Sequence, residues 1–125
     1  MRCSTGGVVW SPALGPRSHM FRAGILHTVA PYNTDIDRDD KLRRCYSNSL
    51  SEAARRSCSG EDESTVTTTL LGTGVKMISV DDSALCLKQS LMSSDEKFTQ
   101  DLVVELVLQT SEVCDQVINL MSSSE

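Results

Sequence analysis

Residues 65–75 read TVTTTLLGTGV, and this stretch decides which kind of fold we expect. Its first half is rich in β-branched residues, which favours a strand, and it runs into a turn that contains Gly72 and Gly74. Ser79 then begins Ser-Val-Asp-Asp with Asp82 at the third helical position, which is a capping-box pattern. A strand, a glycine turn and a capped helix in this order predict one unit of an α/β protein.

The same alternation continues on both sides of this stretch. Apolar spacing predicts strands at 6–10, 20–30 and 101–109, and helices at 39–58, after Ser79, and from Thr110 or Ser111 onward. Within the predicted helices, apolar side chains recur every three or four residues and should face the core. They are Leu42, Cys45, Tyr46, Leu50 and Ala53, then Val80, Ala84, Leu87 and Leu91, then Val113, Cys114, Val117, Leu120 and Met121. The order β, β, α, β, α, β, α predicts a largely parallel sheet covered by helices on both faces.

Composition excludes several classes of function. The 125 residues suffice for a single domain, and 17 acidic against 12 basic residues argue against a dedicated nucleic-acid binder. No apolar run approaches the roughly 20 residues that span a bilayer, so we expect no membrane segment. Five widely spaced cysteines without a CxxC pair argue against zinc and favour reduced thiols in an intracellular protein, cytoplasmic or nuclear.

The glycine turn is the candidate binding element. Ligands of parallel sheets bind beyond the carboxyl ends of the strands, which would bring residues 72–75 and the strand end at Leu108 and Gln109 to one rim. A Gly-x-Gly turn can present backbone N–H groups to a phosphate, but the local pattern alone is more typical of a plain tight turn between a strand and a helix. We interpret His27 as a hydrogen-bonded core residue, and we predict no catalytic residue and no metal site.

Several segments, taken together, resemble the macro domain family. Residues 24–31, GILHTVAP, are similar to its strand I-H-x-V-G-P, and residues 42–53 to the helix that follows. Residues 70–75, LLGTGV, resemble its second phosphate loop. Residues 6–17 and 102–121 resemble the preceding strand and the final strand and helix, so the resemblance covers nearly the whole chain.

The resemblance implies a three-layer α/β/α sandwich with a mixed, largely parallel sheet, formed as a single domain over 1–125 with loosely ordered ends at 1–22 and 122–125. It also implies binding of ADP-ribose, as a ligand and not a cofactor, or of a mono-ADP-ribosylated protein. Carried over by position, the backbone around the diphosphate and distal ribose would come from Gly72, Thr73, Gly74 and Val75. Thr69 and Leu70 would line the cleft before them, and Leu108, with Gln109, would lie near the adenine side.

The chain also departs from the family pattern. The family has an Asn-Ala-Ala-Asn loop followed by glycines before the segments matched here, and the sequence contains neither. Lys76 replaces an expected aromatic residue and Ala30 an expected glycine. We therefore expect an N-terminally truncated domain and leave weak de-ADP-ribosylation open. The alternative is a catalytically inactive scaffold that acts as an interaction or regulatory module. A dinucleotide-binding domain of another family is a weaker alternative, because the Gly-x-Gly is too short for its fingerprint.

Overall fold

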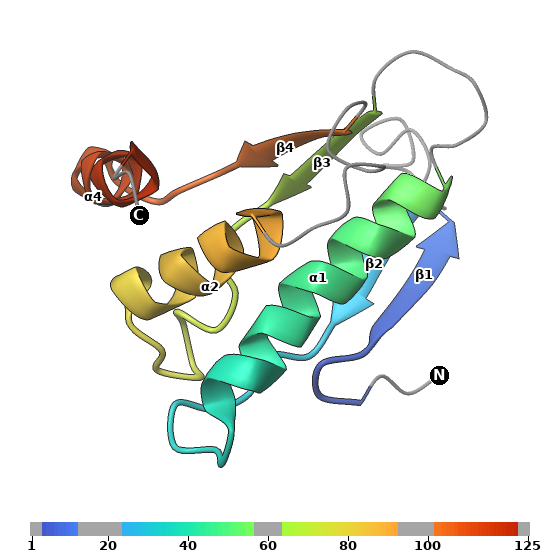
Figure 1. Cartoon of the computed structure of the whole chain (residues 1–125), viewed down its shortest axis with the longest axis horizontal. Helices are drawn as coiled ribbons and strands as arrows, with labels where there is room; N and C mark the ends of the chain where they lie inside the picture. Colours follow the sequence, from blue (N-terminus) through green and yellow to red (C-terminus); the bar gives the residue numbers. More distant parts are fainter. Residues whose placement is uncertain (1–3, 13–23, 57–63, 93–101, 123–125) are drawn as a thin grey trace.

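Strands and helices alternate along the chain in the predicted order (Figure 1). The structure, a computed structural model, describes residues 4–12, 24–56, 64–92 and 102–122. The strands are β1 (Val8–Pro12), β2 (Gly24–Thr28), β3 (Ser64–Thr68) and β4 (Leu102–Leu106). The helices are α1 (Arg38–Arg56), α2 (Val80–Met92) and α4 (Ser111–Ser122). β1 lies within the range 1–22 that we expected to be loosely ordered, whereas residues 13–22 and 123–125 lie outside the described residues.

The strands pair in two ways. β1 and β2 are antiparallel, with Val9 opposite His27, whereas β3 and β4 are parallel, with Val66 opposite Val104. Over the described ranges these are two separate two-stranded sheets, not one continuous ladder. The mixture of parallel and antiparallel pairing agrees with an α/β fold.

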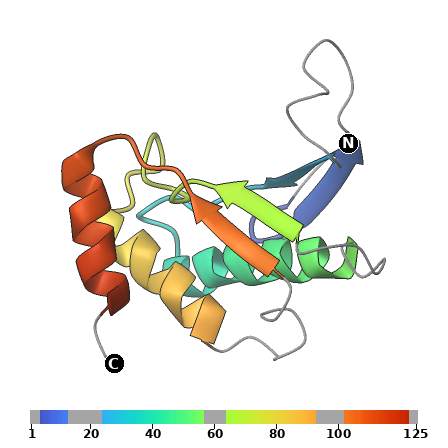
Figure 2. The ribbon, with the colours of Figure 1, turned by 90° about the horizontal axis from the view of Figure 1, so that it is seen from above.

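The helices lie beside one another against the strands. Figure 2 shows α1 and α2 together on one side of both strand pairs, and α4 next to α2. α1 contacts β1, β2 and β3 as well as α2, so it joins the two sheets, and α2 packs against α4. Among the described residues, no helix is seen over the other face of the strands in Figure 2.

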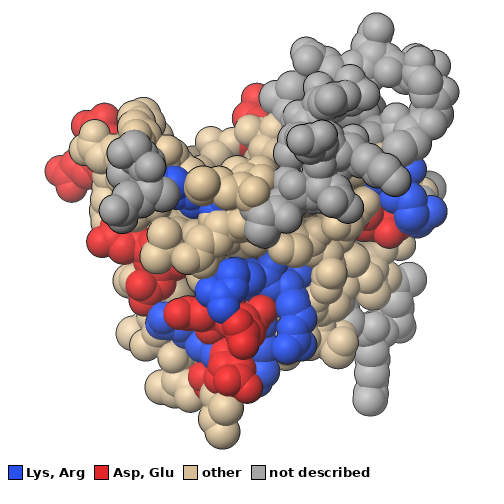
Figure 3. All heavy atoms as spheres, in the orientation of Figure 1, with Lys and Arg blue, Asp and Glu red and all other residues tan. Residues whose placement is uncertain are grey.

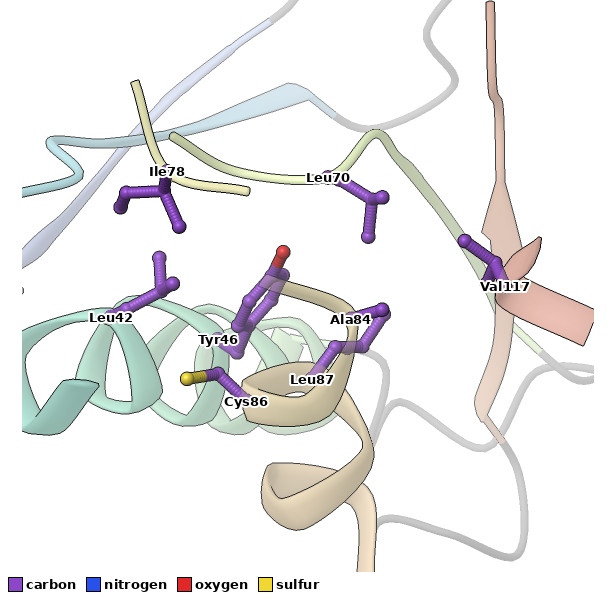
Figure 4. Close-up of a cluster of buried hydrophobic side chains, with 8 residues drawn as sticks. All are labelled: Leu42, Tyr46, Leu70, Ile78, Ala84, Cys86, Leu87 and Val117. Carbon is purple, nitrogen blue, oxygen red and sulfur yellow. The ribbon is translucent and has the colours of Figure 1, made fainter. Parts of the chain in front are cut away.

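The hydrophobic core lies between these helices and the segment after β3 (Figure 4). It consists of Leu42 and Tyr46 from α1, Ala84, Cys86 and Leu87 from α2, Val117 from α4, and Leu70 and Ile78 from the segment between β3 and α2. The predicted helical spacing is confirmed in α1, where Leu42, Cys45, Tyr46 and Leu50 are all buried. Burial of these aliphatic faces is the main stabilising contribution that the helices make.

Helix caps fix where α2 and α4 begin. Ser79 Oγ accepts a hydrogen bond from the N–H of Asp82 at 3.1 Å, as the capping pattern predicted. Thr110 Oγ1 accepts from the N–H of Val113 at 3.2 Å, so Thr110, and not Ser111, caps α4. Acidic residues occupy the first turns of α1 and α2, where they complement the helix dipole.

β1 lies two residues later than the predicted 6–10, and β3 and β4 end earlier than the sequence predicted. β3 ends at Thr68 instead of residue 71, and β4 ends at Leu106 instead of residue 109. β2 covers Gly24–Thr28 of the predicted 20–30, whose first residues lie outside the described part. The chain leaves the β3 ladder because the side chain of Leu70 enters the core and the backbone then turns at Gly72.

Candidate functional site

The segment between β3 and α2, residues 69–79, forms the candidate site, and we call it the glycine loop. Gly72 has a φ of 79°, a backbone conformation that residues with a Cβ rarely adopt. The carbonyl oxygen of Gly72 accepts a hydrogen bond from the N–H of Ile78 at 2.9 Å. The N–H of Met77 donates to the carbonyl oxygen of Gly74 at 3.0 Å, which closes a tight turn over residues 74–77.

The outer part of the glycine loop presents donors that the protein itself does not use. The backbone N–H groups of Gly74, Val75 and Lys76 donate no hydrogen bond within the part of the chain that the structure describes. The loop is open here, because Val75 is 85 % exposed and a Cβ built on Gly74 would meet nothing within 4 Å. Successive N–H groups at an exposed turn form a favourable contact surface for an anion.

The inner part of the loop is fixed to the core. Leu70 and Ile78 are buried at its two ends. The N–H of Leu71 donates to the hydroxyl oxygen of Tyr46 at 2.8 Å, and Ser83 Oγ donates to the carbonyl oxygen of Leu71 at 2.7 Å. The hydroxyl oxygens of Tyr46 and Ser83 lie 2.6 Å apart. Burial raises the pKa of Tyr46, an effect larger than the opposing one of its hydrogen bonds, so its hydroxyl stays protonated at neutral pH.

The segment after β2 lies directly beside the glycine loop. The N–H of Asn33 donates to the carbonyl oxygen of Lys76 at 2.8 Å. Lys76 Nζ lies 3.8 Å from the centre of the Tyr32 ring, a cation–π contact. Lys76 stands where an aromatic residue was expected, and its ammonium group lies against the ring of a neighbouring aromatic residue.

A cluster of charges joins the same segment to the start of α2. The Arg38 guanidinium donates to Asp82 Oδ2 at 3.0 Å and to Asp39 Oδ1 at 2.9 Å, and also to Asn33 Oδ1. Burial lowers the pKa of Arg38, but Asp39 and Asp82 outweigh this effect and raise it. Figure 3 shows acidic and basic side chains intermixed over the first half of α1. Both carboxylates are thus paired with Arg38, and the cluster joins the segment after β2 to the starts of α1 and α2.

The predicted site residues lie in different environments. Gly72, Thr73, Gly74 and Val75 come together in the glycine loop, and Thr73 Oγ1 donates to the carbonyl oxygen of Leu70 at 3.1 Å. Thr69 is exposed, whereas the side chain of Leu70 belongs to the core, so only the backbone of Leu70 could border a ligand.

Leu108 and Gln109 follow β4 on the neighbouring strand. The N–H of Val107 donates to the carbonyl oxygen of Thr68 at 2.8 Å, so the chain after β4 passes beside the beginning of the glycine loop. Leu108 packs against the hydrophobic core, and Gln109 is exposed. The side chain of Leu108 is therefore engaged mainly with the protein interior.

The interpretation of His27 as a core residue was wrong. His27 is exposed on β2, and its Nε2 lies 2.8 Å from Ser11 Oγ on β1. It faces solvent because the side chains of β2 alternate and Leu26 and Thr28 take the inner face.

Sequence reasoning also missed the site contributions of Tyr46, Ser83 and Tyr32. Each acts through a contact with a distant part of the chain, such as the one between Leu71 and Tyr46, 25 residues apart. In the described ranges, no cluster of three or more His, Cys, Asp or Glu side chains could hold a metal. None of the helices in those ranges is long and apolar enough to cross a membrane.

Comparison with known proteins finds one matching family model and several similar solved structures. The family model described as Macro domain matches residues 1–87. The Oceanobacillus iheyensis macrodomain with ADP is similar at 19% identity and a TM-score of 0.77, over 94% of this chain and 58% of its own. A mutant of that macrodomain is similar at 21% identity and a TM-score of 0.74, over 95% and 57%. The Trypanosoma brucei macrodomain in complex with ADP is similar at 19% identity and a TM-score of 0.66, over 93% of this chain and 46% of its own.

The similar solved structures are longer than this chain and share its fold. The chain spans between 46% and 58% of the length of these three solved structures. Their similarity at this level of identity shows the fold, and it confirms the predicted α/β class. A search among curated protein sequences finds no match.

Proposed function

This chain belongs to the macro domain family, whose model matches residues 1–87, and we propose that its glycine loop binds ADP-ribose, free or attached to a protein. The family resemblance predicted from the sequence is thereby confirmed. The observation that carries the proposal is the row of backbone N–H groups at Gly74, Val75 and Lys76, which donate to no acceptor among the described residues. The similarity to the Oceanobacillus iheyensis and Trypanosoma brucei macrodomains with ADP supports a nucleotide ligand.

The chemistry of a diphosphate fits this surface. Hydrogen bonds from N–H groups to a charged acceptor contribute about 1.5–3 kcal/mol each, and the ammonium group of Lys76 adds positive charge nearby. Gly74 has no side chain, so the phosphate can approach the backbone closely. The loop is anchored by buried residues at both ends, which lowers the entropy cost of ordering it on binding.

The other predicted site residues belong to the same proposal. Gly72 and Thr73 shape the turn, Thr69 and the backbone of Leu70 border the ligand before the loop, and Leu108 lies toward the adenine side. Thr69 is exposed and available for this contact. Leu108 would contribute mainly through the backbone, because its side chain packs against the core.

The side chains of the glycine loop favour a role in ligand binding over a role in hydrolysis. Among residues 69–79 the only ionisable side chain is Lys76, so the loop itself has no carboxylate or imidazole for acid–base catalysis. We therefore favour recognition of ADP-ribose by a non-catalytic module over de-ADP-ribosylation. Release of ADP-ribose from a mono-ADP-ribosylated protein faster than in buffer alone would favour the hydrolase.

A proline substitution tests whether backbone N–H groups carry the binding. Val75 is the second residue of the turn over 74–77, the position at which proline is best tolerated. Val75→Pro should keep the fold but remove one N–H donor, whereas Val75→Ala shortens the exposed side chain and keeps the donor. Binding of ADP-ribose is measured by isothermal titration calorimetry, with AMP as a control that lacks the diphosphate.

The two variants should differ clearly in their affinity for ADP-ribose. We expect Val75→Pro to weaken ADP-ribose binding by about tenfold or more, the loss of one charge-assisted hydrogen bond, and Val75→Ala to change it less than about twofold. Equal affinities for the wild type and Val75→Pro would contradict backbone recognition. Absence of any ADP-ribose binding by the wild type would favour the inactive scaffold.

We also propose that the protein works inside the cell, in the cytoplasm or nucleus. Cys86 and Cys114 are free thiols in the structure, which suits a reducing compartment. Microscopy of the tagged protein should show it within cells, and a purely secreted distribution would contradict this.

A further inference from the structure

We infer that Tyr46 and Ser83 are positioning residues for the glycine loop: they hold the peptide groups on both sides of Leu71 and so orient the N–H groups that follow. This inference rests on the proposed function of the loop, whose phosphate-binding donors it concerns. Neither residue belongs to the loop itself, and neither is expected to touch the ligand, because both are buried.

The three groups form a closed cycle of hydrogen bonds. Ser83 Oγ–H donates to the carbonyl oxygen of Leu71, so its proton is committed. The short contact between the two hydroxyls must then be made by the proton of Tyr46, which donates to Ser83 Oγ. The oxygen of Tyr46 in turn accepts from the N–H of Leu71. Each hydroxyl therefore donates one hydrogen bond and accepts one.

This cycle restrains the backbone at one particular point. The N–H of Leu71 belongs to the peptide group before that residue, and its carbonyl belongs to the peptide group after it. Holding both groups fixes the two backbone dihedral angles of Leu71, and therefore the direction in which the chain enters Gly72. At the other end, the N–H of Ile78 donates to the carbonyl oxygen of Gly72. The exposed donors at 74–76 lie between these two fixed points.

The cycle also joins three elements. Tyr46 is on α1, Ser83 is on α2, and Leu71 is in the glycine loop. Figure 4 shows the hydroxyl of Tyr46 pointing from α1 toward the side on which Leu70 and Ile78 lie. Tyr46 is 2 % exposed and Ser83 is fully buried, so water does not compete for these hydrogen bonds.

A second serine on α2 supplies a matched control. Ser90 is also buried, and its Oγ donates to the carbonyl oxygen of Arg43 on α1 at 3.3 Å. Ser83→Ala and Ser90→Ala thus remove the same hydroxyl from the same helix, but only Ser83 reaches the glycine loop. Tyr46→Phe keeps the aromatic ring in the core and removes only the hydroxyl, which gives a second variant with the packing preserved.

The test measures two properties of each folded variant at a temperature well below its unfolding midpoint. The first is the affinity for ADP-ribose by calorimetry. The second is the backbone order of residues 72–76 without ligand, from ¹⁵N relaxation. We expect Tyr46→Phe and Ser83→Ala to lose about tenfold in affinity and to lower the order parameters of these residues. Ser90→Ala should stay within about twofold of the wild type in affinity, with an unchanged loop.

The outcomes separate the two proposals. If Tyr46→Phe and Ser83→Ala bind as tightly as Ser90→Ala and leave the order of the loop unchanged, the positioning role is overturned. If the wild type does not bind ADP-ribose, the proposed function fails, and the relaxation data alone then decide whether Tyr46 and Ser83 hold the loop.

Discussion

Gly72 and Gly74 lie two residues apart in the same loop, but they are needed for different reasons. Gly72 has a φ of 79°, and a Cβ at this position would lie 2.6 Å from Ile78 Cδ1. Gly74 does not have a positive φ, and a Cβ built on it would lie in open space. Gly72 is therefore required by the fold, whereas Gly74 leaves the backbone accessible to a ligand.

Alanine substitutions should separate these two roles. We expect Gly72→Ala to lower the free energy of unfolding by about 1–2 kcal/mol or more, since it adds a left-handed backbone penalty to a clash. Gly74→Ala should change it by less than about 0.5 kcal/mol. Urea unfolding measures both, and equal losses for the two variants would contradict the difference in their backbone conformations.

Residues of the site were predictable from the sequence only where the signal is local. Gly72 and Gly74 stand out because glycines between a strand and a helix cap indicate a special turn. The contact of Lys76 with Tyr32 and that of Leu71 with Tyr46 depend on how distant segments meet. No spacing rule connects such residues, so they emerge only from the folded arrangement.

At the scale of elements, the helices follow the sequence more closely than the strands do. α1, α2 and α4 occupy the predicted segments because each has a long apolar periodicity, and α2 and α4 also have an end cap as a second, independent signal. A short apolar run gives only one signal. Residues 69–71 look like the end of a strand, but Leu70 packs into the core and the chain leaves the ladder at Thr68.

The apolar face of α2 offers a direct test of the packing. Leu87 is 2 % exposed in the core, and Leu85 on the same helix is 43 % exposed. Leu87→Ala should lower the free energy of unfolding by about 2–5 kcal/mol, through lost burial and a cavity, and Leu85→Ala by less than about 1 kcal/mol. Chemical denaturation of both variants gives the comparison. A larger loss for Leu85→Ala would show that α2 is rotated from the described packing.

At the scale of the whole molecule, α1 holds together the two strand pairs found among the described residues. The core that α1 shares with α2, α4 and the glycine loop adds to this connection. The sequence predicted the alternation of elements, but it could not give the separation of the pairs, because strand pairing depends on contacts between distant segments. Since the candidate site rests on this shared core, its geometry depends on the stability of the whole molecule.

The buried hydroxyl of Tyr46 makes that stability sensitive to alkaline pH. The ordinary pKa of tyrosine is 10.0, and burial raises the pKa in the folded protein. The unfolded chain therefore loses this proton first as the pH rises. The contribution of Tyr46 is fully present below about pH 10 and is lost as the pH rises through the higher pKa of the folded state.

Denaturant unfolding at pH 8 and pH 10.5 checks this effect. The free energy of unfolding of the wild type should fall between the two values, and that of Tyr46→Phe should fall less, because phenylalanine does not titrate. Other groups that titrate in this range, including Cys86, are common to both proteins. Equal decreases in the two proteins would show that Tyr46 has no such linkage.

The most direct measurement for the central claim is an NMR titration of the ¹⁵N-labelled chain with ADP-ribose, which observes the N–H groups themselves. We predict that the signals of Gly74, Val75 and Lys76 shift together and saturate at one concentration, whereas Asn119 on the exposed side of α4 does not move. AMP should produce smaller shifts at the same concentration. Saturating shifts elsewhere with these three signals unchanged, or no shifts at all, would contradict the proposal that the glycine loop is the binding site.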